Sequence, residues 1–408
     1  MNNMKKPKIR FKGFTDDWEQ RKLAELVTRY EDPVETPHDG YIRLGIRSHA
    51  KGTFHEYVEP GHELETAQMH RVAANKLIFN ITFAWEHAVA VTTEDDAGKL
   101  VSHRFPQFSL SELLRPEFLK YVILDEGFHH KLYLASHGGA GRNRVLKVDE
   151  ALDYPIFFPS VEEQHKIGEF LNQLNDLITL HQRKYEKLQI IKKSMLENCF
   201  PKNGEKVPKI RFSGFTGDWE QRKLGELGKT RSGIGFPDAE QGGKEGVPFY
   251  KVSDMNNVGN EHEMVAANNH VTREQIARKG WKPIDEVPAI FFAKVGAAVL
   301  LNRKRLCRFP FLLDNNTMAY SIDGSALDAD FAITLFDTID LTSLVQVGAL
   351  PSYNSGDVEN IDAVIPEMSE QRKIGAYFKR IDSLITLHHR KLNRTQICIN
   401  RSFLYGSF

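Results

Sequence analysis

Short runs of arginine, lysine and asparagine contain the side chains in this sequence best suited to binding a partner molecule. They occur in IRLGIRSHAKG, GGAGRNRV, KTRSG, LNRKRL and LPSYNSG. Arginine and asparagine match the donors and acceptors on guanine and adenine edges, whereas lysine mainly neutralises phosphate. As a group they are candidate DNA contacts, although a single such residue is more often a solvated surface charge. The candidates are Arg43, Arg47, Ser48, Lys51, Arg142, Asn143, Arg144, Arg231, Lys251, Asn256, Asn257, Arg303, Lys304, Arg305, Tyr353 and Asn354.

Residue patterns typical of enzyme active sites are missing. The sequence has no GxSxG, no GxGxxG strand-to-helix element and no Asn/Asp-Pro-Pro-aromatic tetrapeptide of the kind amino-methyltransferases carry. GELGKT resembles a phosphate-binding loop, but Lys223 stands where that motif needs its first glycine. None of the 16 histidines pairs with cysteine at a zinc spacing. We therefore expect no catalytic residue, no metal site and no cofactor bound by this chain.

Composition indicates an ordinary globular protein. A chain of 408 residues is long enough for two to four domains, and its 54 basic and 54 acidic residues balance. Zero net charge argues against a uniformly basic coat and leaves room for local basic surfaces. No apolar run reaches the length of a membrane span, the start lacks the apolar core of a secretion signal, and the three cysteines are far apart. We expect a cytoplasmic protein without membrane contact.

Two pairs of segments repeat within the chain, and they must position the candidate residues. KIRFKGFTDDWEQRKLAEL (residues 8–26) returns as KIRFSGFTGDWEQRKLGEL (209–227). PSVEEQHKIGEFLNQLNDLITLHQRK (159–184) returns as PEMSEQRKIGAYFKRIDSLITLHHRK (366–391). Each half thus has a shared opening, a private middle and a shared closing segment. The long period excludes a solenoid and indicates a duplicated pair of domains.

The closing segments are predicted to be long helices. Apolar residues recur every three or four positions over roughly four heptads, which is typical of a coiled-coil seam. A helix of this span is roughly 55 Å long, and we expect the two copies to pack antiparallel about a pseudo-two-fold axis. Two independent helical hairpins remain the alternative. The predicted seam residues are Ile167, Leu174, Leu177, His181, Leu188, Ile374, Ile381, Leu384, His388 and Leu392.

His181 and His388 occupy equivalent positions in TLHQRK and TLHHRK. They are either a pH switch or ligand pair, or polar residues that fix the helix register as buried asparagines do, and the second interpretation is favoured.

The private middles, about 42–148 and 246–350, are predicted to be mainly β. YIRLGIRS, KLIFNITF and AVAVTT in the first, and VPFYKVS, VPAIFFAKV and AAVLLN in the second, have strand composition. Segments such as FHEYVEPG, SDMNNVGN and LLDNNTM are predicted to connect them, and loops on a rigid scaffold commonly carry recognition. The fold class is therefore α+β.

These features together resemble the specificity subunit of type I restriction-modification enzymes over essentially the whole chain. The telling residues are the duplicated IRFxGFTxDWEQRKLxEL opening, the duplicated PxxxEQxKIGxF…ITLHxRK helix and the divergent middles. IFFAKVGAAVLLNRKR followed by LLDNNTMAY also looks like one type of target recognition domain from that family.

The resemblance implies a domain order as well as a function. Residues 1–158 would form the first target recognition domain, 159–199 the first spacer helix, 200–208 a linker, 209–365 the second recognition domain and 366–408 the second spacer helix. Each recognition domain would read one half of a split double-stranded DNA target, and the helices would set the gap between the halves. Expected partners are two methylation subunits, which carry S-adenosylmethionine, and motor-nuclease restriction subunits.

One departure and two alternatives accompany this interpretation. The second helix ends in NRSFLYGSF, where Gly406 puts its last turns in doubt. A duplicated protein-interaction scaffold would also explain the neutral net charge, and its affinity would not fall as salt rises. A self-contained methyltransferase or nuclease is disfavoured by the missing motifs.

Overall fold

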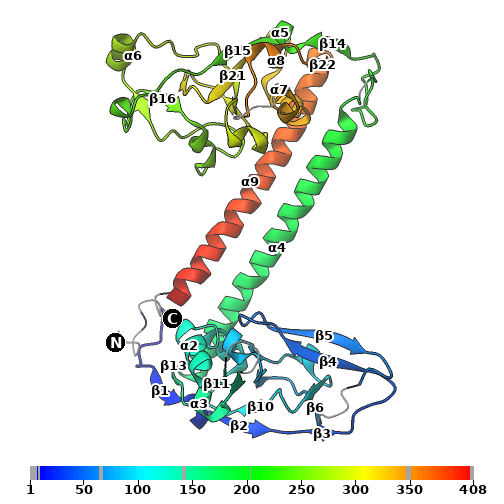
Figure 1. Cartoon of the computed structure of the whole chain (residues 1–408), viewed down its shortest axis with the longest axis vertical. Helices are drawn as coiled ribbons and strands as arrows, with labels where there is room; N and C mark the ends of the chain where they lie inside the picture. Colours follow the sequence, from blue (N-terminus) through cyan, green and yellow to red (C-terminus); the bar gives the residue numbers. More distant parts are fainter. Residues whose placement is uncertain are drawn as a thin grey trace. The chain divides into compact units, whose positions relative to one another are not determined.

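The computed structural model describes residues 7, 10–63, 68–139, 144–202, 204–345 and 351–404, with side chains as far as Cys398. These residues form two compact units (Figure 1). The first comprises the described residues up to Thr179 together with those from Asn393 onward, and the second comprises Leu180–Leu392. No described helix has an apolar stretch long enough to traverse a lipid bilayer.

The first unit contains β-sheets beside helices. Its two larger sheets have the strand orders β2-β10-β7-β8 and β3-β6-β9-β4-β5, and the pairs β1-β13 and β11-β12 complete it. Its core includes Trp18, Phe79 and Phe128. The elements are β1 Glu19–Lys22, η1 Leu23–Glu25, β2 Val27–Tyr30, β3 Pro33–Val34, β4 Tyr41–Ile46, β5 Thr53–Val58, β6 Met69–Arg71, β7 Lys76–Phe79, η2 Ala84–Glu86, β8 Val89–Val91, η3 Glu94–Asp96, β9 Leu100–Ser102, β10 Gln107–Leu110, α1 Pro116–Val122, α2 Glu126–Ala135, β11 Ser136–His137, β12 Val145–Leu146, α3 Val148–Leu152, β13 Pro155–Phe158 and the start of α4 Val161–Cys199.

The second unit has sheets of order β15-β21-β18-β19 and β17-β16-β20, and the pair β14-β22. Its main core gathers Trp219, Tyr320, Phe331 and Phe378. The elements are β14 Glu220–Lys223, α5 Leu224–Leu227, β15 Gly228–Ser232, η5 Asp238–Glu240, β16 Val247–Tyr250, η6 Val252–Asn256, β17 His270–Val271, α6 Arg273–Lys279, β18 Ala289–Ala293, η7 Ala297–Leu301, β19 Lys304–Cys307, β20 Leu312–Leu313, β21 Thr317–Ile322, α7 Ala329–Thr338, η8 Leu341–Leu344, α8 Ser355–Glu359, β22 Asp362–Ile365 and most of α9 Met368–Leu404.

Several local predictions about the middles are wrong in whole or in part. LLDNNTM is only partly a loop, because Leu312–Leu313 is β20 and β21 begins at Thr317. AAVLLN is the 3-10 helix η7 and not a strand, because Gly296 and Asn302 bound it with positive φ angles of 85° and 50°. The residues FHEYV of FHEYVEPG belong to strand β5 and not to a loop, since β5 pairs with β4 along its whole length. The α+β class and the two long helices are confirmed.

In each unit the repeated opening folds onto the repeated closing segment. The EQRK strand of the opening pairs antiparallel with the strand that leads into the long helix, as β1 with β13 and as β14 with β22. The two leucines that follow are anchored alike, because the Leu23 N–H donates to the Tyr154 carbonyl and the Leu224 N–H to that of Ile361 (2.9 and 3.0 Å). We call this arrangement of opening strand, closing strand and helix start the hub.

A buried ion pair fastens each hub. Arg10 makes two bonds of 2.7 Å to the carboxylate of Glu163, and Arg211 makes bonds of 2.8 and 2.7 Å to that of Glu370. Both glutamate side chains are fully buried and both arginines keep 14% of their side-chain surface exposed. Two parallel bonds give such a pair directional specificity as well as energy. The repeated arginine and glutamate are therefore structural.

The neighbouring glutamine connects each hub to its private middle. Gln164 accepts a bond from the Arg115 N–H (2.9 Å) and donates to the Leu113 carbonyl (2.8 Å). Its counterpart Gln371 accepts from the Asp328 N–H (2.8 Å) and donates to the Ala326 carbonyl (3.1 Å). The partners in the middle are backbone groups in both units, so their side-chain identities are free to differ.

A glycine in each long helix allows another helix to approach closely. A Cβ added to Gly375 would lie 2.6 Å from the Phe331 nitrogen of α7, and one added to Gly168 would lie 2.9 Å from the Glu117 carbonyl carbon of α1. These distances are well below van der Waals contact. The glycine of the KIG motif is thus required by packing.

Within the second unit, α4 and α9 lie side by side and antiparallel (Figure 1). His181 Nδ1 lies 2.9 Å from His388 Nδ1, and about three turns further along α4, Lys192 Nζ lies 2.7 Å from Asp382 Oδ1. Burial, aided by the nearby charges of Lys184 and Lys391, lowers the pKa of both histidines. The predicted antiparallel pairing is therefore seen here, and whether the histidines act as a switch stays a prediction.

The remaining seam residues divide into three groups. Leu188 and Leu392 are half-buried, while Ile167, Leu174, Ile374 and Ile381 pack with the domain cores or lie buried beside them. The assignments of Leu177 and Leu384 are wrong, because these side chains are 45% and 38% exposed. The next residue in each helix, Ile178 or Ile385, is half-buried instead. A shift of one residue rotates the seam by about 100° around the helix, which explains the error.

The predicted domain boundaries stay predictions. α4 begins at Val161 and α9 at Met368, whereas the compact units divide within both helices, after Thr179 and after Leu392.

Candidate nucleic-acid interface

In the first unit, one hairpin gathers four of the predicted DNA contacts. β4 and β5 pair from Tyr41 with Val58 to Ile46 with Thr53, and residues 47–52 connect them. Arg43 lies in β4, and Arg47, Ser48 and Lys51 lie in the connection. These four residues are close in sequence, and the hairpin places Arg43 on the strand and the other three at its connection.

The hairpin arginines are held by neighbouring groups. Arg43 donates to Glu56 on the facing strand (2.5 Å). Arg47 donates to the Thr53 carbonyl, and its guanidinium lies 5.3 Å from the centre of the Phe54 ring. Such contacts orient a guanidinium before a partner arrives. Lys51 is exposed and suited to neutralising phosphate.

Exposed apolar side chains accompany these basic residues, and sequence reasoning missed them. Ile42, Phe54 and Tyr57 on the same hairpin are 45%, 37% and 55% exposed. YIRL and FHEY both contain aromatic or β-branched residues, and this strand-like composition could have identified them. Phe54 pairs with Gly45 and so shares a face with Arg43. Ile42 and Tyr57 pair with each other and lie on the other face. An aromatic side chain beside basic ones, as Phe54 is beside Arg47, is typical of a nucleic-acid surface.

The other predicted contacts of the first unit are separate from this hairpin. Arg142 and Asn143 lie outside the described residues. Arg144 stacks on Tyr133, with 4.3 Å between its guanidinium and the ring centre, and donates to the tyrosine hydroxyl (3.2 Å).

In the second unit, residues 251–268 form a loop built on two buried polar side chains. Asp254 and Asn260 are fully buried. The Asp254 carboxylate accepts from the N–H groups of Lys251 and Asn268 (both 2.7 Å). The Asn260 amide donates to the Asp254 and Ala266 carbonyls (both 2.7 Å). Because buried polar groups satisfied on several sides fix a unique conformation, this segment, the reading loop, is rigid although η6 is its one helical turn.

The reading loop displays two of the predicted contacts beside a third. Asn256 is exposed and accepts a bond from Arg303 Nη1 (2.8 Å). Asn257 donates to the Asn268 side chain (3.1 Å). The structure therefore brings Arg303, which is 47 residues away in sequence, to the same surface as the asparagines. Lys251 begins the loop and donates from Nζ to Gln241 (3.1 Å).

Two predicted contacts of the second unit are wrong because their side chains lie in the protein interior. Lys304 is 4% exposed and donates to the Ile339 carbonyl (2.7 Å), and burial lowers its pKa to about 8. Tyr353 is 5% exposed in the main core, where its hydroxyl donates to the Ala293 carbonyl (2.5 Å) and burial raises its pKa. Neither can reach a base or a phosphate.

Three further candidates have structural partners. Arg305 is half-buried and donates to the Asn260 carbonyl of the reading loop (2.5 Å), and burial lowers its pKa. Asn354 caps α8, accepting from the Asp357 N–H (3.1 Å). Arg231 in β15 pairs with Glu286 (2.6 Å). Arg305 thus supports the reading loop, and Asn354 caps the start of α8.

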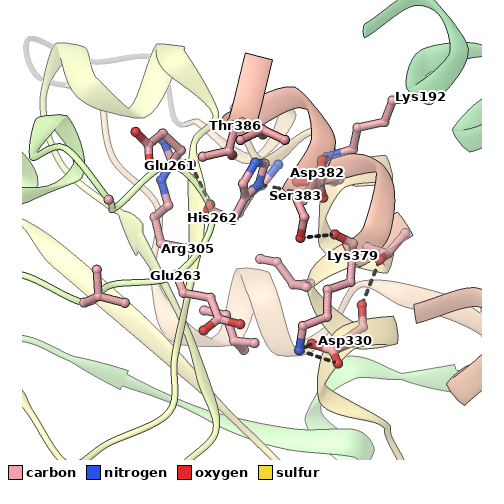
Figure 2. A pocket seen from close by; sticks show the side chains of 18 of the residues that line it. Lys192, Glu261, His262, Glu263, Arg305, Asp330, Lys379, Asp382, Ser383 and Thr386 are labelled. Carbon is pink, nitrogen blue, oxygen red and sulfur yellow. Dashed lines mark hydrogen bonds and ion pairs between the residues drawn. The ribbon is translucent and has the colours of Figure 1, made fainter. Parts of the chain in front are cut away.

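A charged cavity of about 600 Å³ lies between the reading loop and the long helices within the second unit (Figure 2). Glu261 of the loop pairs with Arg390 of α9 (3.0 Å). Lys192 of α4 is held by Asp337 of α7 and Asp382 of α9 (2.8 and 2.7 Å). Burial opposes the charge on Lys192, but the two carboxylates outweigh it and raise its pKa.

The cavity also contains a half-buried histidine from the loop. His262 Nδ1 lies 3.7 Å from Asp382, yet burial keeps the His262 pKa below its ordinary value. Figure 2 shows Glu261 and Arg305 facing the α9 side chains Ser383 and Lys379 across the cavity. Acidic and basic side chains are both well represented there. Ion pairs at this cavity thus hold the loop to the helices.

Among the described residues, no group of three or more His, Cys, Asp or Glu side chains is arranged to hold a metal ion.

Residues 216–395 match the family model described as "Type I restriction modification DNA specificity domain". This match covers the second hub, the reading loop and most of α9. This match confirms the resemblance to type I restriction-modification specificity subunits that was inferred from the sequence. The first half contains the same hub.

Two curated relatives come from Methanocaldococcus jannaschii. The type I restriction enzyme MjaIX specificity subunit is 26% identical over 264 residues, which are 61% of this chain and 58% of the relative. The MjaVIII specificity subunit is 23% identical over 274 residues, or 60% and 59% of the two chains. The matches thus span less than two thirds of those relatives.

A solved structure shares the fold. The crystal structure of a type I restriction-modification system S subunit from M. genitalium matches with a TM-score of 0.60, covering 99% of both chains at 12% identity. At this identity the similarity extends to the fold alone.

Proposed function

We propose that this chain is a non-catalytic subunit that reads a split target on double-stranded DNA for a type I restriction-modification complex. The β4–β5 hairpin reads one half-site and the reading loop, with Arg303, reads the other. Arginine and asparagine there recognise base edges, while Lys51 neutralises phosphate.

The two hubs support the protein partners that we propose. Because each half carries the same hub, the chain offers the same docking surface twice and binds two copies of one methylation subunit. That subunit carries S-adenosylmethionine and modifies adenine, which must leave the base stack to react. Motor-nuclease subunits join the same complex for cleavage.

The observation that carries the proposal is the match of residues 216–395 to a DNA specificity domain, together with the presence of a hub in each half of the chain. The two surfaces also have the composition expected of DNA readers. They combine guanidinium and amide groups held by their neighbours with exposed lysine or apolar side chains.

The test is a methylome. The chain is expressed with its cognate methylation subunit in a host without adenine methylation, and modified DNA is sequenced. A split motif with a fixed gap is expected. A single contiguous palindrome, or methyl transfer by this chain alone, would refute the proposal.

Single substitutions then assign the half-sites. Arg43→Ala in the hairpin and Asn256→Ala in the reading loop should each relax one half-site and leave the other unchanged. Lys304→Met is the matched control, since this lysine is buried. A different outcome would favour a protein-interaction scaffold: the subunits co-purify, no DNA is methylated, and the affinity for DNA does not change with salt concentration.

A further inference from the structure

The reading loop presents one apolar side chain almost entirely to solvent. Val258 is 83% exposed, more than any other large apolar side chain among the described residues. Isolated exposed valines are common and need no explanation by themselves. This one follows directly after Asn256 and Asn257 in the chain, and Asn256 accepts a bond from Arg303.

Val258 occupies a fixed position. The Asn257 N–H donates to the Asp254 carbonyl, and the Asn260 N–H donates to that of Asn257 (both 3.0 Å). Gly259 follows with a φ of +106°, and a Cβ there would lie 3.2 Å from Val265 Cγ2. The backbone on both sides of Val258 is therefore held, so this side chain projects from a rigid support.

The loop is also fixed to the helices of its unit. Glu261, three residues after Val258, pairs with Arg390 of α9, and Arg305 holds the Asn260 carbonyl from the other side. Binding a partner at Val258 would thus require little ordering of the loop. Preorganisation of this kind lowers the cost of association.

The chemistry of the neighbours specifies the partner. In the major groove an A·T pair presents the N6 and N7 groups of adenine, which asparagine recognises, and the 5-methyl group of thymine, which takes an apolar contact. Asparagine side chains followed by an exposed valine match that combination. A cytosine lacks the methyl group, so contact with it discriminates between the pyrimidines.

We propose that Val258 is a specificity-determining residue that contacts the 5-methyl group of a thymine in the half-site read by the second unit. This inference rests on the proposed function and deepens it. The asparagines contact adenine, and Val258 contacts the methyl group of a pyrimidine in the same half-site.

The experiment uses the complete complex with its methylation subunit and the target identified by the methylome. Each thymine of the second half-site is replaced in turn by deoxyuridine, which lacks only the 5-methyl group. At one position the wild-type complex should lose about fourfold in affinity, the factor that burying one methyl-sized group is worth.

Val258→Ala completes the test. It should lose a similar factor on the thymine target and show no further loss with deoxyuridine, because the two changes remove the same contact. Leu300→Ala is the control, since this side chain is also exposed (60%) in the same unit but lies on η7. It should leave the fourfold effect of deoxyuridine intact.

The outcomes separate this inference from the function on which it rests. A complex that methylates no split motif refutes the proposed function itself. A split motif combined with a deoxyuridine effect that persists in Val258→Ala overturns the role of Val258 alone. So does a second half-site without any sensitive thymine.

Discussion

Removing Arg211 should unfold the second hub locally while leaving the first intact. Arg211→Met keeps much of the side-chain volume but deprives the fully buried Glu370 carboxylate of its two-bond partner. Breaking a buried ion pair from one side costs about 3–5 kcal/mol, because it leaves an unpaired charge in the interior. We expect about 3 kcal/mol, the lower end, since Arg211 retains 14% exposure.

A double-mutant cycle isolates the pair. Glu370→Gln removes the charge, so adding Arg211→Met in that background should cost only about 1 kcal/mol, mainly the lost bond from Arg211 to the Gly217 carbonyl (2.6 Å). The coupling between the two residues is then about 2 kcal/mol.

Hydrogen exchange measured by mass spectrometry is the appropriate assay. A chain with two compact units does not unfold in one step, so a single unfolding midpoint would mix them. Protection of β14 and β22 reports the second hub, and that of β1 and β13 reports the first. Arg10→Met is the matched control and should affect β1 and β13 only. The buried-pair argument would be refuted if Arg211→Met lost the same stability whether residue 370 is glutamate or, in the Glu370→Gln background, glutamine.

Three further predictions concern other parts of the chain. Because the folded chain lowers the pKa of His181 and His388, the unfolded chain binds more protons as pH falls through about 6.5. The hydrogen-exchange protection factors of α4 and α9 around these histidines should therefore fall on acidification, and less so in the His181→Asn/His388→Asn variant; an equal fall in both would contradict this. Gly375→Ala should destabilise the second unit by about 1–3 kcal/mol and Gly375→Val by more, measured by hydrogen exchange in α7 and α9, and a neutral valine variant would disprove the close approach of α7. In the assembled complex, Lys51→Ala should reduce the slope of log affinity against log salt by about 0.9, whereas Lys304→Met should leave the slope unchanged, and a reduced slope for the buried lysine would show that it reaches phosphate.

The elements that repeat or have a clear period could be predicted from the sequence. The two long helices follow from their apolar spacing, and the strands β4, β16 and β18 follow from their composition. The error at Leu177 and Leu384 is one of phase, since several apolar residues compete for the seam. The periodic pattern predicts reliably that a helix has an apolar face. It predicts less reliably which residue lies at the centre of that face.

Contacts between residues far apart in sequence could not be predicted. Arg211 and Glu370 are 159 residues apart, and no local pattern indicates that they meet. The run of basic residues around Lys304 was interpreted as a surface patch, although alternation along β19 turns this lysine inward. The reading loop depends on Asp254 and Asn260, whose burial is a property of the folded unit alone.

The hub has an evolutionary consequence. Its ion pairs join repeated residues to each other, and its strand pairs join the repeated EQRK strand to β13 or β22 through the backbone. Gln164 and Gln371 hold the private middles only through backbone groups. Gly375 likewise meets the backbone of α7. A middle of different sequence can therefore be inherited between the same repeated stretches without loss of these contacts. Genetic exchange within the stretches that encode the repeats would replace a reader and preserve the assembly that holds it.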